Sequence, residues 1–375
     1  MSNRFVRALV YGTSAFFFLA GPASAGDNPI VVGQVIDLSG PNASIGRDYV
    51  AGIKTCFDMV NSQGGIHGRR IHLTVRDDGG QAEAAAKAAT ELIERDGVDY
   101  LFGGVGDEQT KSIVDAPAFR RSSLTLFAPL ANSEFDAGTR ILFWRPEYQQ
   151  EIRHLFAHFS KLGIASVGIA YQETRTSQAA LHSLTTEIRE RQMRVVATAR
   201  IGENGERIAQ EAKQLAMTQP GFVLVIADTI NTAMFLKEYR KHDAQRFVAG
   251  TSLVNLATLR ELAGERATEW TVFSQVVPNP AAGTSLIQVE HMSMMRKFRD
   301  ETVSALTLEG FAAAKTLVTI LQQAKGDRRT ALYDFRAQKR DIDIGGLLLS
   351  ASRNNHRLSS YLDTALLRKG SGLMF

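Results

Sequence analysis

The chain has 375 residues, of which 44% are hydrophobic and 22% charged, with a formal net charge of +4 and a sequence pI of about 9.1. This length leaves room for two domains of ordinary size. The net charge is small and no Lys/Arg cluster forms a basic stripe, which argues against nucleic acid as a partner. The single cysteine, Cys56, excludes an internal disulfide and is expected to be buried beside the apolar positions of a helix.

The first 25 residues have the three parts of a secretory signal peptide. Arg4 and Arg7 form a basic start, residues 8–20 are largely apolar, and residues 23–25 form a small-x-small cleavage site. The apolar run is too short to span a membrane. We therefore expect cleavage near Gly26, export of the mature chain, and no direct insertion into the membrane.

From residue 28 onward, strand-like and helix-like segments alternate. The first series has predicted strands at 30–36, 71–75, 124–127 and 141–144 and one beginning at 100, with helices at 46–61 and 82–96 and a short helix that Pro117 ends. The second series has predicted helices at 147–161, 177–191, 205–217, 231–241 and 255–263, with strands at 166–171, 194–199, 221–226, 246–250 and 270–276. Such alternation predicts two doubly wound α/β domains with parallel sheets.

The pattern changes after residue 280. Helices are predicted at 288–299, 307–323 and 330–336, followed by short strands and turns from 345 to the end. The helix at 307–323 has an apolar face that needs a cover. We expect these late helices to return to the first domain and pack on its sheet.

A glycine-rich turn at 103–106 separates the strand that begins at residue 100 from the short helix that follows. Glycines allow a sharp turn and a close approach of the backbone to a bound group, and the helix start offers free N–H groups. Small ligands bind at such strand ends in open α/β sheets. The alternative interpretation is structural, with Asp107 as the cap of its helix.

Short segments with a shared order and spacing run through nearly the whole chain after residue 26. They are IVVGQ at 30–34, LSGP at 38–41, NSQGGIHGR at 61–69, DDG at 77–79, R-x-x-Y-x-x-E at 145–151, SQVVP at 274–278 and LEGF at 308–311. Each is a weak signal alone. Together they resemble the periplasmic leucine/isoleucine/valine-binding protein family, the type I substrate-binding proteins of ABC importers.

The resemblance implies a clamp of two doubly wound parallel-sheet lobes joined by three crossing segments, the type I periplasmic binding protein fold. Carried onto this sequence, it places the signal peptide at 1–25, lobe one at 28–145 plus 277–355, and lobe two at 146–276 plus 356–375. Hinges are expected at 145–146 and 276–280. The lobes are expected to close on a ligand in the cleft between them.

The same resemblance implies the positions that contact the ligand. They are Ile45, Asp107, Leu130, Asn132, Tyr148, Thr176, Asp228, Thr251 and Ser252. Asp107 stands where amino-acid-binding members offer a serine to the ligand's carboxylate, and Thr251 stands where they offer an acid to its ammonium. The charge pattern for an α-amino acid is therefore not reproduced, which argues against branched-chain amino acids as the ligand.

Structural interpretations stand beside these assignments. Tyr148 can serve lobe packing instead of ligand contact. Asp77 and Asp78 are expected to form a turn with local backbone hydrogen bonds, because no third ligand is spaced to join them in a metal site. Glu309 is expected to have a structural role on its helix.

No catalytic motif stands out in the sequence. It has no G-x-S-x-G elbow, no P-loop and no complete dinucleotide fingerprint, and its histidines lack metal-ligand spacing. We therefore expect no enzyme, no cofactor and no metal. An exported hydrolase on a similar fold would need a nucleophile–base pair in the cleft, and no such pair is visible.

The sequence thus predicts a periplasmic, monomeric binding protein for a small polar organic molecule. An amino-acid-like compound, an amide, a carboxylate with a hydroxyl or aromatic body and a cationic solute all remain open as ligands. The expected partner is an ABC permease complex in the inner membrane. The alternative is a binding protein of the same fold that reports its ligand to a receptor or regulator.

Overall fold

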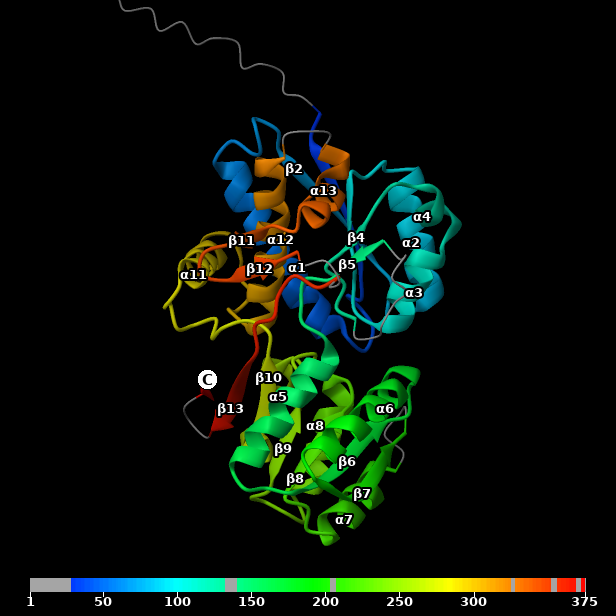
Figure 1. The fold of residues 1–375 in the computed structure, drawn as a ribbon, viewed down its shortest axis with the longest axis vertical. Helices are drawn as coiled ribbons and strands as arrows, with labels where there is room; N and C mark the ends of the chain where they lie inside the picture. The colour runs from blue at the N-terminus through cyan, green and yellow to red at the C-terminus, as the bar shows by residue number, and fades with distance from the viewer. Residues whose placement is uncertain are drawn as a thin grey trace, which may run out of the picture.

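The computed structural model describes residues 28–131, 140–202, 207–324, 328–351, 356–368 and 372–374. The predicted signal peptide lies outside these residues. Within them the chain forms two α/β lobes, drawn one above the other in Figure 1. No helix of the described part is both long and apolar enough to cross a lipid bilayer.

The sheet of lobe one has five parallel strands in the order β2-β1-β3-β4-β5. Its strands are β1 (Ile30–Ile36), β2 (Ile71–Asp77), β3 (Tyr100–Phe102), β4 (Leu126–Phe127) and β5 (Ile141–Leu142). Side chains of β1 alternate between two cores: Val32 and Ile36 pack on one face of the sheet and Val35 on the other. Because both faces are buried, the strand reads as a continuous apolar run.

Helices cover both faces of this sheet. On one side lie α2 (Ala82–Glu94), α3 (Asp107–Asp115) and α4 (Pro117–Arg121), and on the other α1 (Ala43–Ser62) and α12 (Ala305–Gln323) (Figure 1). Lobe one also contains α11 (Leu286–Phe298), α13 (Ala331–Gln338) and the ribbon of β11 (Asp341–Asp343) and β12 (Leu348–Ser350). The predicted return of the late helices to the first lobe is confirmed, because Leu308, Phe311 and Leu317 of α12 are buried in the same core as α1.

Helices α1 and α12 cross with almost no space between their backbones. A Cβ atom added to Gly310 would lie 2.1 Å from the carbonyl oxygen of Tyr49, and one added to Gly52 would lie 2.0 Å from that of Thr307. Real Cβ atoms do not come this close to backbone. The two glycines therefore set the distance between the helices.

The sheet of lobe two has seven strands in the order β14-β13-β10-β9-β8-β6-β7. Its parallel strands are β6 (Ser166–Gln172), β7 (Arg194–Ile201), β8 (Phe222–Ile226), β9 (Phe247–Gly250) and β10 (Thr271–Gln275). The last strands, β13 (Asp363–Arg368) and β14 (Gly372–Met374), add to β10 in antiparallel pairs. The prediction of a doubly wound parallel sheet is confirmed for the series and extended by this antiparallel edge.

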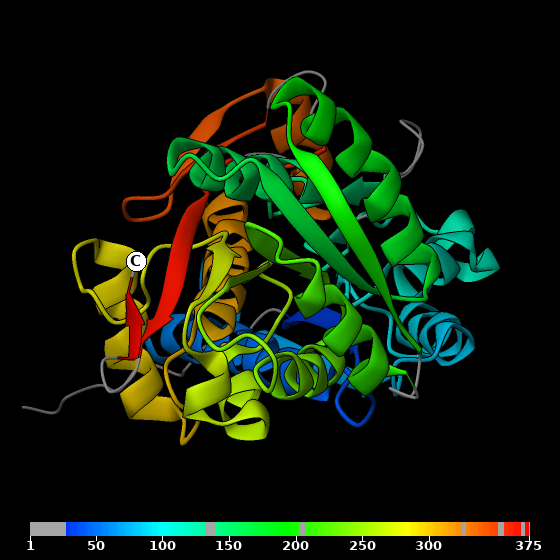
Figure 2. The same cartoon turned by 90° about the horizontal axis from the view of Figure 1, so that it is seen from below.

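Helices again cover both faces of the second sheet. They are α5 (Tyr148–Lys161), α6 (Arg175–Glu190), α7 (Ile208–Met217), α8 (Thr229–Tyr239), α9 (Leu256–Ala263) and the short α10 (Glu265–Thr268). One core packs around α5 and α6, and the other around α7, α8 and α9. Figure 2 shows these lobe-two elements, in green, in front of the blue and cyan elements of lobe one.

The chain crosses between the sheets three times: between β5 and α5, between β10 and α11, and between β12 and β13. Leu358 still belongs to lobe one by its contacts, since its N–H donates to the carbonyl oxygen of Phe143 at 3.0 Å and its own carbonyl accepts from Ser350 at 2.9 Å. We propose that the third crossing begins after Ser359, a few residues beyond the limit at 355 expected from the sequence. The other lobe limits remain predictions.

Candidate ligand-binding cleft

A cleft of about 680 Å³ lies between the two lobes. Lobe one contributes the segments that follow β3 and β4, together with the start of α1. Lobe two contributes the segments that follow β6, β8 and β9. The cleft therefore lies at the carboxyl ends of both sheets, where open α/β sheets bind their ligands.

Most of the residues predicted to contact a ligand line this cleft. The lining includes Ile45, Asp107, Leu130, Tyr148, Asp228 and Thr251. Asn132 lies outside the described residues. Thr176 lies in the first turn of α6, where the side chain of its neighbour Ser177 lines the cleft.

Ser252 lies apart from this group. It accepts a hydrogen bond from Nη2 of the buried Arg145, and it lines a second cavity of about 650 Å³ between α9 and the start of α12. Thr251 and Leu253, on either side of it, face the ligand cleft instead. Both directions are available because β9 ends at Gly250 and the chain bends at residues 252–254.

Part of the polar wall was not predicted from the sequence. Gln172, the last residue of β6, and Glu173 and Thr174, which follow it, line the cleft from lobe two, while Asn42 and Gln109 line it from lobe one. A signal for these positions was present, because each comes directly after a predicted strand or near the start of a helix. Their side chains carry no charge pattern that separates them from ordinary loop residues.

The glycine-rich turn positions Asp107 at the start of α3. Gly106 occupies the N-cap position with φ of 109°, a conformation that favours glycine, and as a glycine it has no side chain with which to cap the helix. Asp107 is the first helical residue, so the interpretation of Asp107 as a cap is wrong. Asp107 is 9% exposed as a residue and lines the cleft beside the helix N-terminus, which favours a negative charge.

Asp228 occupies the corresponding place in lobe two, at the N-cap of α8. Its Oδ1 accepts from the Asn231 N–H at 2.8 Å, and its Oδ2 accepts from Asn231 Nδ2 at 2.9 Å. Residues of this type are preferred caps because they satisfy the orphan N–H groups of the first turn. The cap fixes the carboxylate at the cleft wall.

Tyr148 lies in the wall next to Thr251. The residue is 6% exposed, and burial raises the pKa of its hydroxyl far above the ordinary value, with the Glu151 carboxylate adding to the increase and the Thr251 side chain opposing it. Among the described residues, the Tyr148 Oη has no hydrogen bond of good geometry. A buried hydroxyl in this state is available to a ligand in the cleft.

Behind the cleft, a buried charged network connects the lobes. Arg145, in the first crossing segment, has its Nη2 3.7 Å from Glu151 of α5 and its Nε 3.5 Å from Glu309 of α12. Glu151 also accepts from the Ser252 N–H at 2.9 Å and from Ser274 Oγ at 2.6 Å. All three charged side chains are at most 3% exposed, and burial raises the pKa of Glu309 although Arg145 opposes the increase.

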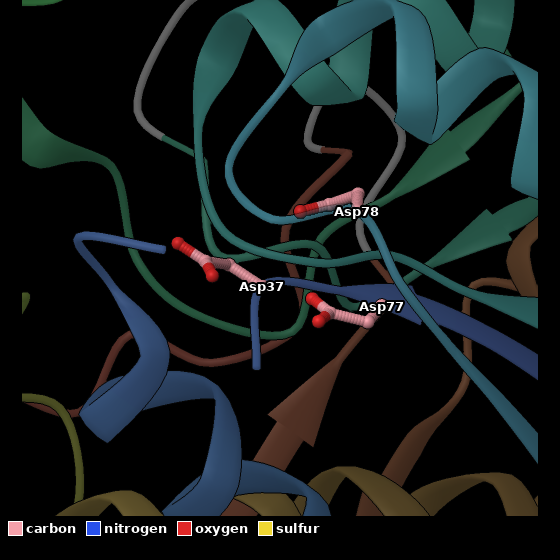
Figure 3. A group of neighbouring side chains, drawn as sticks. All are labelled: Asp37, Asp77 and Asp78. Atoms are coloured by element: carbon pink, nitrogen blue, oxygen red, sulfur yellow. The ribbon is translucent and has the colours of Figure 1, made fainter. Parts of the chain in front are cut away.

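The strand ends of lobe one bring three carboxylates together. Oxygen atoms of Asp37, Asp77 and Asp78 lie within 4.8 Å of one another, at the ends of β1 and β2 (Figure 3). The expectation that no third acid joins Asp77 and Asp78 was wrong, because Asp37 follows the neighbouring parallel strand. All three also accept backbone N–H groups of the surrounding turns, as the predicted turn requires.

We expect Asp78→Asn to stabilise the protein at neutral pH. Burial raises the pKa of Asp78 to about 6, and Asp37 and Asp77 add to the increase. The folded state therefore binds a proton more tightly than the unfolded state, so stability falls as pH rises from about 4 through 6. The asparagine amide does not ionise and so avoids this loss. We expect Asp78→Asn to raise the free energy of unfolding by roughly 1–3 kcal/mol at pH 7.5 and to leave it unchanged near pH 4.

Urea unfolding at several pH values measures this gain, with Asp77→Asn as the matched control. Burial raises the pKa of Asp77, but hydrogen bonds from Ser39, Leu38 and Gly79 together lower it. Its removal should therefore give no gain at pH 7.5. Equal effects of the two variants would contradict the assignment of the raised pKa to Asp78.

Two α/β lobes around a cleft at the carboxyl ends of both sheets define a two-lobed ligand-binding protein. The periplasmic binding protein family model matches residues 29–370. The chain therefore belongs to the periplasmic binding protein family. Its relatives are binding proteins, and the family implies a periplasmic location.

Several relatives carry names of the leucine/isoleucine/valine-binding type. Homolog 3 of Brucella melitensis is 33% identical over 89 residues, which span 24% of each chain. Homolog 7 of Brucella abortus is 20% identical over 372 residues, covering 91% of this chain and 89% of that protein. The match with higher sequence identity is therefore local, whereas the match with lower identity extends over almost the whole chain.

Solved structures show the same fold. A possible leucine/isoleucine/valine-binding protein from Rhodopirellula baltica matches with a TM-score of 0.84 at 21% identity, covering 95% of this chain and 97% of that one. The LivJ substrate-binding protein of Streptococcus pneumoniae, in complex with isoleucine, matches with a TM-score of 0.74 at 14% identity, covering 90% and 99%. At these identities the likeness establishes the fold alone.

Proposed function

We propose that this protein captures a small polar organic molecule in the cleft and delivers it to an ABC importer. The ligand belongs to the amino-acid-like, amide or carboxylate solutes, and the partner is a permease complex in the inner membrane. The protein acts by binding and not by catalysis. The cleft carries this proposal, because residues from both lobes line it at the carboxyl ends of both sheets.

The mechanism follows from the two-sided lining. Ile45, Asp107 and Leu130 belong to lobe one, whereas Asp228 and Thr251 belong to lobe two. A ligand that contacts both sets favours the closed arrangement, since only closure gives it both sets of contacts. A permease that contacts both lobes distinguishes closed from open protein, which couples delivery to loading.

A solute screen on refolded protein tests the capture step. The chain without residues 1–25 is purified, unfolded and refolded to remove any carried ligand, and its melting temperature is measured with amino acids, amides, carboxylates and amines. A ligand that binds only the folded state raises the melting temperature. Small-angle scattering with the best solute should give a smaller radius of gyration, and an unchanged radius would contradict closure.

Reconstitution tests the delivery step. A candidate ABC permease with its ATPase is placed in proteoliposomes, and ATP hydrolysis is measured with loaded and with ligand-free protein. Loaded protein should stimulate hydrolysis. Solute binding without stimulation would favour the alternative, a binding protein that reports to a receptor or regulator.

A further inference from the structure

We propose that the ligand carries a positively charged nitrogen, as a protonated amine or a quaternary ammonium, held between Asp107 and Asp228. This inference rests on the proposed function and narrows its ligand class. It assigns one carboxylate of each lobe to the same cationic group. The ligand as a whole then has a net positive charge.

The charge of the cleft lining carries this inference. Among the described residues that line the cleft, every charged side chain is acidic: Asp107 and Glu108 in lobe one, Glu173 and Asp228 in lobe two. The described lining includes no lysine, arginine or histidine. In a partly enclosed cleft such charges attract cations and repel anions more strongly than at an open surface.

Not all four acids contribute equally. Glu173 is paired with Arg207 at 2.9 Å and with Arg200 at 3.4 Å, so these two cations largely balance its charge. Glu108 is an exposed residue at the rim. Asp107 and Asp228 remain as the acids that the fold holds in the cleft wall.

One buried cation, Arg357, lies near Asp107 but is not part of the cleft lining. The Arg357 guanidinium lies 4.1 Å from the ring centre of Phe143 and donates to the carbonyl oxygen of Pro146 at 3.2 Å. Its Nε lies 3.9 Å from a Glu147 carboxylate oxygen, and burial lowers the pKa of Arg357 while the charges of Glu147, Asp107 and Glu151 oppose that lowering. Arg357 is not among the described residues that line the cleft, so it is not placed to anchor an anionic ligand there.

The positions of the two acids link charge to closure. Asp107 begins α3 in lobe one, and Asp228 caps α8 in lobe two. Closing an empty cleft brings like charges together, which is unfavourable. A cation between them replaces this repulsion by two attractions, so the closed state is favoured when a cation is bound.

The remaining walls fit the body of such a ligand. Ile45, Leu130 and Ile226 are apolar lining residues, and Tyr148 adds an aromatic ring. The face of an aromatic ring attracts ammonium groups, and the hydroxyl of a tyrosine can also accept a hydrogen bond from a protonated amine. Anion binding at the α3 N-terminus is opposed, since Asp107 and Glu108 occupy its first turn.

A matched series of solutes tests the charge requirement. Butylamine, γ-aminobutyrate, butyramide and butyrate share a four-carbon body and differ in charge, while phenethylamine, phenylalanine and phenylacetate form an aromatic series. Choline represents the quaternary ammonium. Affinities are measured by calorimetry and by thermal shift on refolded protein. We expect a cationic member to bind at least about tenfold more tightly than its zwitterionic, neutral and anionic counterparts.

Two isosteric variants test the residues. Asp107→Asn and Asp228→Asn keep the side-chain shape, and asparagine retains the capping ability of position 228. Each should weaken binding of the best cation about 10- to 100-fold. Asp300→Asn, an exposed acid outside the cleft lining, is the control and should leave the affinity unchanged. Circular dichroism checks that all three variants fold.

The outcomes separate this inference from the proposed function. Preferred binding of a zwitterion, an amide or an anion, with closure in solution, would overturn the cationic ligand and leave the binding function intact. Unchanged affinity in both aspartate variants would overturn their role. No stabilisation by any charge class would contradict the proposed function, and the inference with it.

Discussion

Arg145→Met should lower the free energy of unfolding by about 3–5 kcal/mol, because it leaves two carboxylates buried without their cation. Glu151 and Glu309 both face the Arg145 guanidinium, and each is at most 3% exposed. Methionine fills much of the same volume, so the loss measures charge and not packing. Urea unfolding followed by circular dichroism gives the value.

The pH dependence of the stability loss and a second substitution test whether the unpaired carboxylates cause it. With the guanidinium gone, protonation relieves the buried carboxylates, so the loss should be smaller at pH 5 than at pH 8. Adding Glu309→Gln to Arg145→Met should recover part of the stability, while Glu309→Gln alone should have a small effect. A loss below about 1 kcal/mol for Arg145→Met would show that the network contributes little.

Gly310→Ala should destabilise the protein by about 3 kcal/mol or more, although alanine is the better helix former by about 1 kcal/mol. The new methyl group would lie 2.1 Å from the Tyr49 carbonyl oxygen, so α12 and α1 must move apart. Backbone cannot rotate away as a side chain can. Thermal and urea unfolding measure the effect.

Gly33→Ala is the matched control for this substitution. Gly33 is also buried, in β1, but its added Cβ would meet the ends of the Val98 and Leu92 side chains at 2.9 and 3.1 Å. These ends can shift by rotation. We therefore expect a loss under about 1.5 kcal/mol. Equal losses in the two variants would refute the backbone contact as the cause.

The fold was largely predictable because its signals are local. Alternating apolar periods located the strands and helices to within a few residues, and the apolar face of α12 indicated a return to lobe one. The antiparallel edge formed by β13 and β14 was not predicted. Whether a late strand joins a sheet in parallel or antiparallel depends on the path of the chain, which short-range patterns do not record.

The sequence predicted which segments line the cleft better than it predicted which side chains face the cleft or contact one another. The strand-end rule and the family resemblance led to Asp107, Tyr148 and Thr251, all of which line the cleft. Ser252 was grouped with Thr251, although the two neighbours line different cavities at the bend that follows β9. Asp37 was missed beside Asp77 because parallel neighbours are distant in sequence. Such pairings appear only after the strand order is known.

The interleaved chain path has a consequence for how the molecule is made. Helix α1 ends at Ser62, yet its partner α12 begins only at Ala305, after the whole parallel part of the second sheet has been synthesised. The second sheet is likewise incomplete until β13, which starts at Asp363, has been synthesised. Neither lobe is complete until the ribosome has nearly finished. Folding therefore depends on contacts of long sequence separation, which are slow to form and leave apolar surface open to chaperones in the meantime.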